Sequence, residues 1–151
     1  MIKISIQEQD FNVDKEYQEI KNFSSQAGAI VQFTGLVRAD NTDKGQVEAL
    51  TLEHYPGMTE AAIEDIIQQA KLRWPILATT VIHRVGKLLS QDNIVLVVVA
   101  AQHRAAAFEA ASYIMDYLKN DVPLWKKQSI NNTSSWVEQK DSDKKRKKLW
   151  Q

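Results

Sequence analysis

Two lysines stand on either side of a forced corner in the stretch "DYLKNDVPLWKK", residues 116–127. Lys119 ends an apolar helical run, and Lys126 follows Val122-Pro123, where the residue before the proline is biased toward extended backbone. If the corner brings the two ammonium groups together, each disfavours the charge of the other, which suits acid–base or nucleophilic chemistry. The alternative is structural: Lys119 complements the helix dipole and Lys126 belongs to a solvent-facing strand.

Three further basic residues stand at places where an anion could bind. His103 and Arg104, in "AAQHRAAAF", fall where a buried strand gives way to a helix. Free backbone N–H groups and the positive end of the helix dipole gather there, which suits a phosphate or a carboxylate. Arg38 follows "FTGLV" as a strand runs out into a loop, and a guanidinium can fork onto a phosphate. For each residue a solvated side chain is the structural alternative.

The other candidates are interpreted as structural. His83 alternates with apolar residues in "TVIHRVG", which is typical of a strand histidine, and His54 belongs to the turn before a helix. The chain has no cysteine, which excludes disulfides, thiolate metal sites and cysteine nucleophiles. With three scattered histidines, we expect no metal site and no cofactor. The run Lys144 to Lys148 is interpreted as a solvated tail, with attraction of an acidic partner as the alternative.

The elements that must position these residues follow from hydrophobic periodicity. Strands are predicted over residues 2–7, 28–38, 47–55, 78–86, 93–101, 123–130 and 134–139. Helices are predicted over residues 14–23, 55–74 and 102–119, with Asn120 as a left-handed cap after the last. Turns are predicted over residues 41–46 and 131–134.

Strands that alternate with two substantial helices, together with hairpin-like strand pairs, predict an α+β domain. We expect a mixed sheet with helices on one face and extra antiparallel strands. No repeat or linker divides residues 1–151, so one domain is predicted, with a polar tail from about residue 140. The 19 basic residues balance 19 acidic ones, which argues against a general nucleic-acid binder.

The sequence also bears on location. The most apolar segment, residues 94–101, is far shorter than the about 20 residues that a membrane helix needs. No signal peptide is visible at the N-terminus. We therefore expect a soluble, cytoplasmic protein that binds neither membrane nor nucleic acid.

Eight motifs occur in one order with close spacing: "FTGLVR", "LTLEHYPGMTE", "RWP", "VIHRVG", "HRAAAFEA", "IMDYLK", "PLWKK" and "WVE". Together, over about residues 28–138, they resemble the large, catalytic subunit family of molybdopterin synthase. The resemblance implies an α/β hammerhead fold with an additional antiparallel sheet. It implies a sulfurtransferase that converts cyclic pyranopterin monophosphate (precursor Z) into molybdopterin. The two sulfurs come from a thiocarboxylate on the C-terminal Gly-Gly of a small ubiquitin-like partner, in a heterotetramer built on a homodimer of large subunits.

The resemblance also implies roles for residues. Lys119 would meet the partner's (thio)carboxylate and assist acyl and proton transfer, and Lys126 would stabilise negative charge or shuttle protons. Besides these two lysines, the implied substrate-binding residues are Leu36, Val37, Arg38, His103, Arg104, Lys127 and Gln128, with Leu36 and Val37 acting through backbone groups. Leu36 stands where relatives often carry lysine, and Gln128 where an acid is common.

Two consequences follow for the mechanism. A chain without cysteine cannot hold sulfur on its own thiolate, so another molecule must present it. His103 and Lys119 are sixteen positions apart on one predicted helix, roughly 24 Å at 1.5 Å per residue. We therefore predict a composite site, with Lys119, Lys126 and Arg38 from one subunit and His103 and Arg104 from its mate. The alternatives are a scaffold that docks the partner without chemistry, and an enzyme that forms a lysine Schiff base alone.

Overall fold

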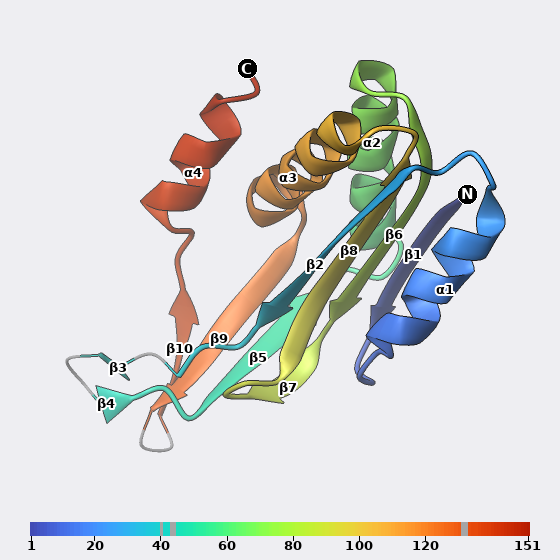
Figure 1. The fold of residues 1–151 in the computed structure, drawn as a ribbon. Coiled ribbons are helices and arrows are strands. Elements are labelled where there is room, and N and C mark those ends of the chain that lie inside the picture. The colour runs from blue at the N-terminus through green and yellow to red at the C-terminus, as the bar shows by residue number, and fades with distance from the viewer. Residues whose placement is uncertain (40, 43–44, 131–132) are drawn as a thin grey trace.

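The computed structural model of the protein describes residues 1–39, 41–42, 45–130 and 133–151. Its mixed sheet has four strands (Figure 1). The strand order is β1 (Ile2–Gln7), β6 (Ile76–Arg84), β8 (Asn93–Ala101) and β2 (Ala29–Leu36). β1 and β6 are parallel, whereas β6 with β8 and β8 with β2 are antiparallel. The predicted mixed sheet is confirmed.

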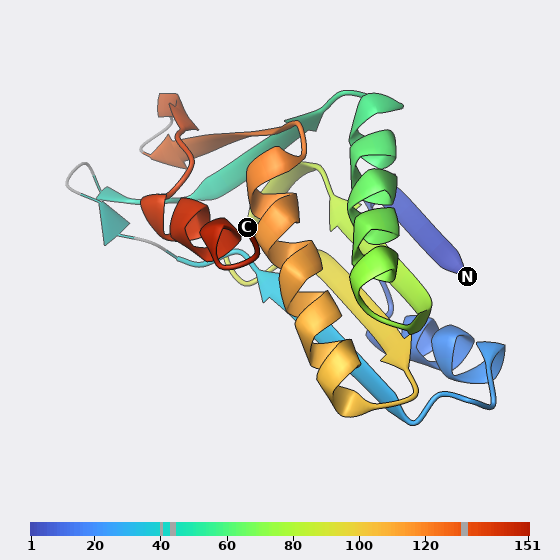
Figure 2. The same cartoon turned by 90° about the horizontal axis from the view of Figure 1, so that it is seen from above.

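Helices cover both faces of this sheet. α2 (Met58–Arg73) and α3 (Arg104–Asp121) share one face, and α1 (Val13–Phe23) lies on the other (Figures 1 and 2). The prediction of helices on one face therefore holds for the two long helices. Strand β8 has apolar side chains on both sides of the sheet. The face opposite α2 and α3 therefore also needs a helix to shield it from water, and α1 covers it. The residues facing α2 and α3 are Val95, Val97 and Val99, and those on the α1 side are Leu96, Val98 and Ala100.

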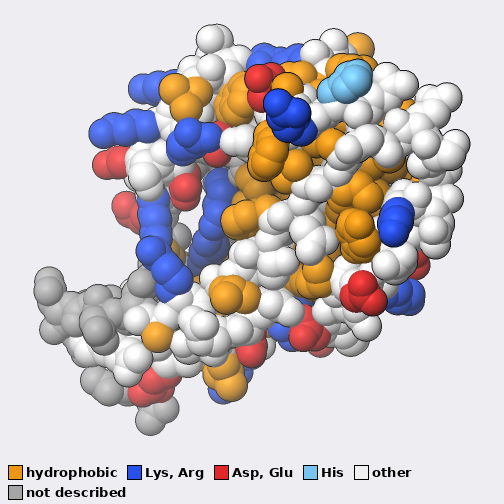
Figure 3. Space-filling model, viewed as in Figure 1, with side chains coloured by type: hydrophobic (Ala, Val, Ile, Leu, Met, Phe, Trp, Pro, Cys, Tyr) orange, Lys and Arg blue, Asp and Glu red, His pale blue; other side chains and the backbone are white. Residues whose placement is uncertain are grey.

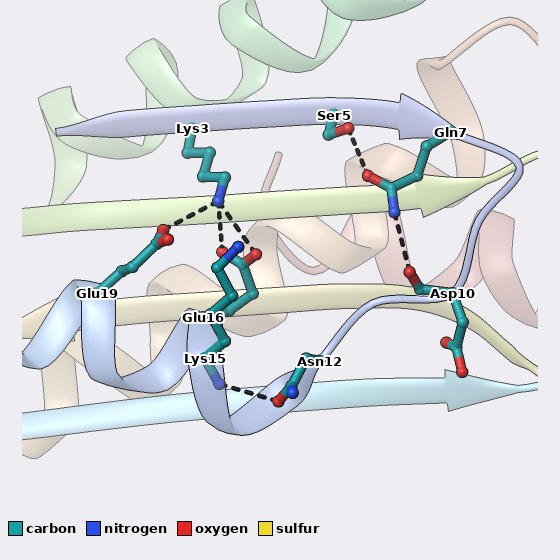
Figure 4. A network of polar contacts seen from close by, with 8 residues as sticks. All are labelled: Lys3, Ser5, Gln7, Asp10, Asn12, Lys15, Glu16 and Glu19. Atoms are coloured by element: carbon teal, nitrogen blue, oxygen red, sulfur yellow. Dashed lines mark hydrogen bonds and ion pairs between the residues drawn. The ribbon is translucent and has the colours of Figure 1, made fainter.

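A polar clamp holds α1 against β1 (Figure 4). The Nζ atom of Lys3 lies 2.8 Å from a carboxylate oxygen of Glu16 and 2.9 Å from one of Glu19. The side chain of Asn12 caps the helix by accepting a hydrogen bond from the backbone N–H of Lys15. Glu16 is buried, and the ammonium of Lys3 compensates for the loss of water around its charge.

A second four-stranded sheet, which is antiparallel, extends from one end of the mixed sheet (Figure 1). Its order is β10 (Thr133–Val137), β9 (Leu124–Ile130), β5 (Ala49–His54) and β7 (Gly86–Leu89), and the short strands β3 (Asn41–Thr42) and β4 (Gly45–Gln46) pair beside it. The predicted extra antiparallel strands are thus present. Residues 43–44 and 131–132, in the two predicted turns, lie outside the described residues.

The segment predicted as a polar tail contains a helix, α4 (Asp141–Lys148), which packs beside α3 (Figure 2). None of its residues is buried. Trp150, just after α4, supplies the apolar contact: its ring lies edge-on at 5.6 Å from that of Trp74 and 5.7 Å from that of Tyr113. Its indole N–H donates to the carboxylate of Asp116 at 2.7 Å. The C-terminal segment therefore packs against α3.

Candidate active site

The corner after α3 places both lysines on one cavity. Val122 has the extended backbone predicted for a residue before proline, with φ −87° and ψ 131°, and β9 begins two residues later. Lys119, in the last turn of α3, and Lys126, on β9, both line this cavity. The corner therefore brings the side chains of the two lysines to the same cavity.

Asn120 takes a different role from the one predicted. It lies within α3, and among the described non-glycine residues only Gln91 has a positive φ, so the prediction of a left-handed cap is wrong. The side-chain amide of Asn120 donates to the backbone carbonyls of Asp116 at 2.6 Å and Asp143 at 3.0 Å. It thereby ties the end of α3 to α4.

The cavity has a volume of about 340 Å³ and opens beside a smaller one of about 130 Å³. Its wall combines α3, the ends of β6 and β8, strand β9 and the segment that leads into α4. Arg38, Ile94, Lys119, Lys126, Val137 and Lys140 line both spaces. Figure 3 shows Lys and Arg side chains gathered around a hollow between α4 and the second sheet.

The main cavity is lined by more positive than negative charge. Its cationic residues are Arg38, Lys119, Lys126 and Lys140, and its acidic residues are Glu138 and Asp143. Like charges at close range favour the binding of an anion between them. The arrangement suits a ligand that carries phosphate or carboxylate groups.

Lys126 is the most strongly perturbed of these cations. Burial lowers its pKa to about 8, helped by the charge of Lys119, by a side-chain hydrogen bond with Lys119 and by the charge of Lys140, whereas Asp143 opposes the shift. A lysine with a pKa near 8 gives up a proton far more readily at neutral pH than an ordinary lysine. Lys126 can therefore act as an acid–base group as well as a positive charge.

His83, interpreted from the sequence as a structural histidine, also lines the main cavity. The sequence feature that could have indicated this position is a polar residue on a buried face of β6. His83 lies on the same face of the strand as Val81, whose side chain is in the core. Lys140 and Asp143 were missed as well. No local pattern could reveal them, because their place depends on the packing of α4 against α3.

Three predicted residues do not reach the cavity within this chain. His103 stands just before α3 without a side-chain capping hydrogen bond, and Arg104 begins the helix. Both are exposed and lie roughly 24 Å of helix away from Lys119. Lys127 points to the opposite side of β9 from Lys126, since neighbouring side chains alternate along a strand. Its Nζ atom lies 3.9 Å from the carboxylate of Glu53 and 4.5 Å from the ring centroid of Trp136.

The remaining predicted residues, Leu36, Val37 and Gln128, line the smaller cavity. The backbone N–H of Val37 donates to Asp92, and its carbonyl accepts from Gln91. That N–H is therefore used within the protein, whereas the Val37 carbonyl keeps a second lone pair that can accept a hydrogen bond. Leu36 and Gln128 both line this smaller space.

In the part of the chain that the structure describes, no three His, Asp or Glu side chains gather as a metal ion would require. Among the described residues, no helix is both long and apolar enough to cross a membrane.

Known proteins are similar to this chain in both sequence and fold. The family described as "MoaE protein" matches residues 6–121. The molybdopterin synthase catalytic subunits of Vibrio cholerae and Escherichia coli are 46% identical over 149 residues and 47% identical over 148, covering 99% and 98% of this chain and 98% and 97% of their own. The solved structure of the molybdopterin biosynthesis MoaE protein from Burkholderia ambifaria superposes with a TM-score of 0.86 and 39% identity, covering 99% of this chain and 98% of its own. With nearly complete coverage in sequence and in structure, this chain belongs to the MoaE protein family.

Proposed function

We propose that this chain is the catalytic subunit of a molybdopterin synthase and works in the cytoplasm as a sulfurtransferase in molybdenum cofactor biosynthesis. The observation that carries the proposal is the cavity shared by Lys119 and Lys126, with two further cations on its wall. Relatives that bear this name match the chain over nearly its whole length. The substrate is precursor Z, whose cyclic phosphate suits a cation-lined cavity.

The two lysines differ in exposure, and this difference suggests separate roles. Lys119 is exposed at the end of α3, where the end of a partner chain can reach it. Its ammonium pairs with the incoming (thio)carboxylate and assists acyl and proton transfer. Lys126 is more buried and has a pKa of about 8, so it stabilises the negative charge that develops or carries a proton.

The sulfur comes from a second protein. The chain has no cysteine on which to hold a persulfide, so a partner must deliver sulfur to the cavity. The donor we propose is a small ubiquitin-like subunit with a thiocarboxylated Gly-Gly terminus. A slender, anionic tail suits the cavity, since Gly-Gly has no side chains and the cations attract its terminal charge.

We further propose that the complete site is shared between two copies of this chain. His103 and Arg104 lie too far from Lys119 on α3 for one small substrate to contact all three within a single chain. A dimer mate can supply the missing pair. Arg38 already stands with the lysines on the cavity wall and belongs to the same half-site.

The surface of α3 is compatible with such a dimer. Arg104, Phe108, Met115 and Lys119 share one helical face, and Phe108 is 62% exposed. A two-fold axis beside the middle of this face sets Phe108 against the mate's Met115, and Arg104 against the mate's Lys119. Phe33, 43% exposed on the edge strand β2, adds apolar surface on the sheet face that α3 covers.

The proposal is tested by replacing Lys119 and supplying both substrates. Lys119→Ala is expected to bind the thiocarboxylated partner as the wild type does, yet to form molybdopterin at least about 100-fold more slowly. Lys71→Ala removes an exposed lysine from the last turn of α2 and is the matched control, expected to keep full activity. Product is measured from purified partner and precursor Z.

Two outcomes would contradict the proposal. Product formation at the wild-type rate by Lys119→Ala would show that Lys119 takes no part in the chemistry and would leave docking of the partner as its only role. Trapping of a substrate on a lysine by borohydride, without any partner, would indicate a Schiff-base enzyme instead.

A further inference from the structure

His83 is a buried imidazole for which the proposed chemistry has no role. It stands on β6 on the same face as Val81, which packs in the apolar core under α2 and α3. His83 is 5% exposed, yet its side chain forms part of the cavity wall together with Lys119 and Lys126. An apolar residue would continue the core at this position, so the imidazole needs another explanation.

The hydrogen bond of His83 defines its tautomer. The Nδ1 atom lies 2.8 Å from the backbone carbonyl of Arg84. A carbonyl can only accept, so Nδ1 carries the proton, and in the neutral ring Nε2 holds a lone pair. The distal nitrogen of His83 is therefore a hydrogen-bond acceptor on a cavity that contains ammonium groups.

The surrounding charges keep this ring neutral. Burial, above all, lowers the pKa of His83 to about 4, and the charges of Lys126 and then Lys119 add to the shift, while the bond to Arg84 opposes it. The other charged groups on the cavity, each from an element packed against it, are Arg38, Glu138, Lys140 and Asp143. Of the two lysines that line the cavity with His83, Lys126 is the less exposed, which makes it the better partner for a buried ring.

We propose that His83 is a positioning residue for Lys126, whose ammonium donates a hydrogen bond to Nε2 through one bridging water molecule. The bond orients the Lys126 amine toward the cavity and stabilises its protonated form. His83 thus limits how far burial and Lys119 can drive Lys126 toward the neutral state. The placement of Lys126 stands on its own, whereas its consequence for sulfur transfer rests on the proposed function.

A pair of substitutions separates the two nitrogens of the ring. His83→Asn keeps a side-chain N–H that can donate to the Arg84 carbonyl but removes the distal acceptor. His83→Gln places an amide oxygen near the position of Nε2 and keeps the acceptor. If His83 only braces β6 through Arg84, Asn is the better replacement; if it positions Lys126, Gln is.

The first readout is the titration of Lys126, followed by NMR of lysines labelled at the ε carbon. The Lys126 signal is assigned as the one that Lys126→Arg removes. In His83→Asn the pKa of Lys126 is expected to fall by about one unit, because a hydrogen bond to the charged form is lost. In His83→Gln it is expected to stay near the wild-type value. An unchanged or raised pKa in His83→Asn would overturn the proposal.

A second readout needs no variant and so does not depend on how the variants fold. In the ¹⁵N-labelled wild type, the Nε2 resonance of His83 is expected to move as Lys126 titrates near pH 8, because its donor changes. A resonance that stays constant through that titration would overturn the proposal as well.

Activity then separates this inference from the proposed function. With partner and precursor Z, the alkaline limb of the kcat/KM profile is expected to move to lower pH in His83→Asn and to remain in place in His83→Gln. If Lys126 titrates as expected but neither the wild type nor either variant forms molybdopterin, the proposed function fails and the positioning role stands. If the wild type forms product and the alkaline limb is the same in both variants, the positioning role is wrong and the function stands.

Discussion

Lys126 is a charged side chain whose amine the fold has largely removed from water. Burial and the neighbouring Lys119 lower its pKa to about 8 from the ordinary 10.5. Between these two values the unfolded chain binds a proton that the folded chain does not, so stability rises with pH across that window. At neutral pH the same shift means that the charged lysine destabilises the fold. A residue that costs stability at this place is typical of a functional site.

Lys126→Met is therefore expected to be more stable than the wild type at pH 7. Methionine keeps most of the apolar stem and removes the charge, and the gain is on the order of 1 kcal/mol. The gain should shrink as pH rises from 8 to 10.5, where the wild type loses its charge too. Urea unfolding at pH 7 and pH 10 measures the difference, with the exposed Lys71→Met as the control. An equal gain at both pH values would show that the charge is not the cause.

Helix α4 shows how an element with no buried residue becomes a wall of the site. Its own side chains contribute ion pairs, such as Lys147 with Asp121 at 2.6 Å, and such exposed pairs are individually weak. The indole of Trp150 supplies the apolar contact and a hydrogen bond to Asp116. Trp150, beyond the end of α4, thus adds aromatic packing to the polar contacts between α4 and α3.

Trp150→Ala is expected to lower the free energy of unfolding by about 1–3 kcal/mol, less than for a fully buried aromatic residue. Leu149→Ala, at the neighbouring position, is the matched control, because Leu149 is 65% exposed and should change stability by less than about 0.5 kcal/mol. Urea unfolding measures both. Equal losses in the two variants would show that Trp150 is not the anchor.

The predicted elements agree with the structure where periodicity is long and strong. Helices α2 and α3 and strand β8 follow from apolar spacing or from a continuous β-branched run. The predicted strand over residues 78–86 ends two residues early, because Gly86 has a φ of +81° and turns the chain into β7. β7 itself was missed, since a four-residue strand has too few positions to show a period.

Over the whole molecule, the proposed composite site predicts recovery of activity on mixing. Lys119→Ala and His103→Ala are each expected to inactivate both sites of their own homodimer. A dimer with one chain of each kind has one doubly damaged site and one intact site. Equal mixing with subunit exchange should restore about a quarter of the wild-type sites, since half of the dimers are mixed.

The measurement is molybdopterin formation after the two variants are unfolded and refolded together. Each variant refolded alone is the control and should remain inactive. Absence of recovery, with mixed dimers demonstrated by differently tagged chains, would place all of these residues in one chain's site.

The sequence by itself determined the α+β class, the chief helices and strands, the family resemblance and the pair of lysines beside the Val122-Pro123 corner. These features depend on local backbone preference and on the spacing of apolar residues, both of which can be followed along the chain. Only the tertiary structure decided that His83, Lys140 and Asp143 share the cavity. Their meeting depends on contacts between elements far apart in sequence, above all on the packing of α4 against α3, and burial against those elements is what changes the protonation of Lys126 and His83.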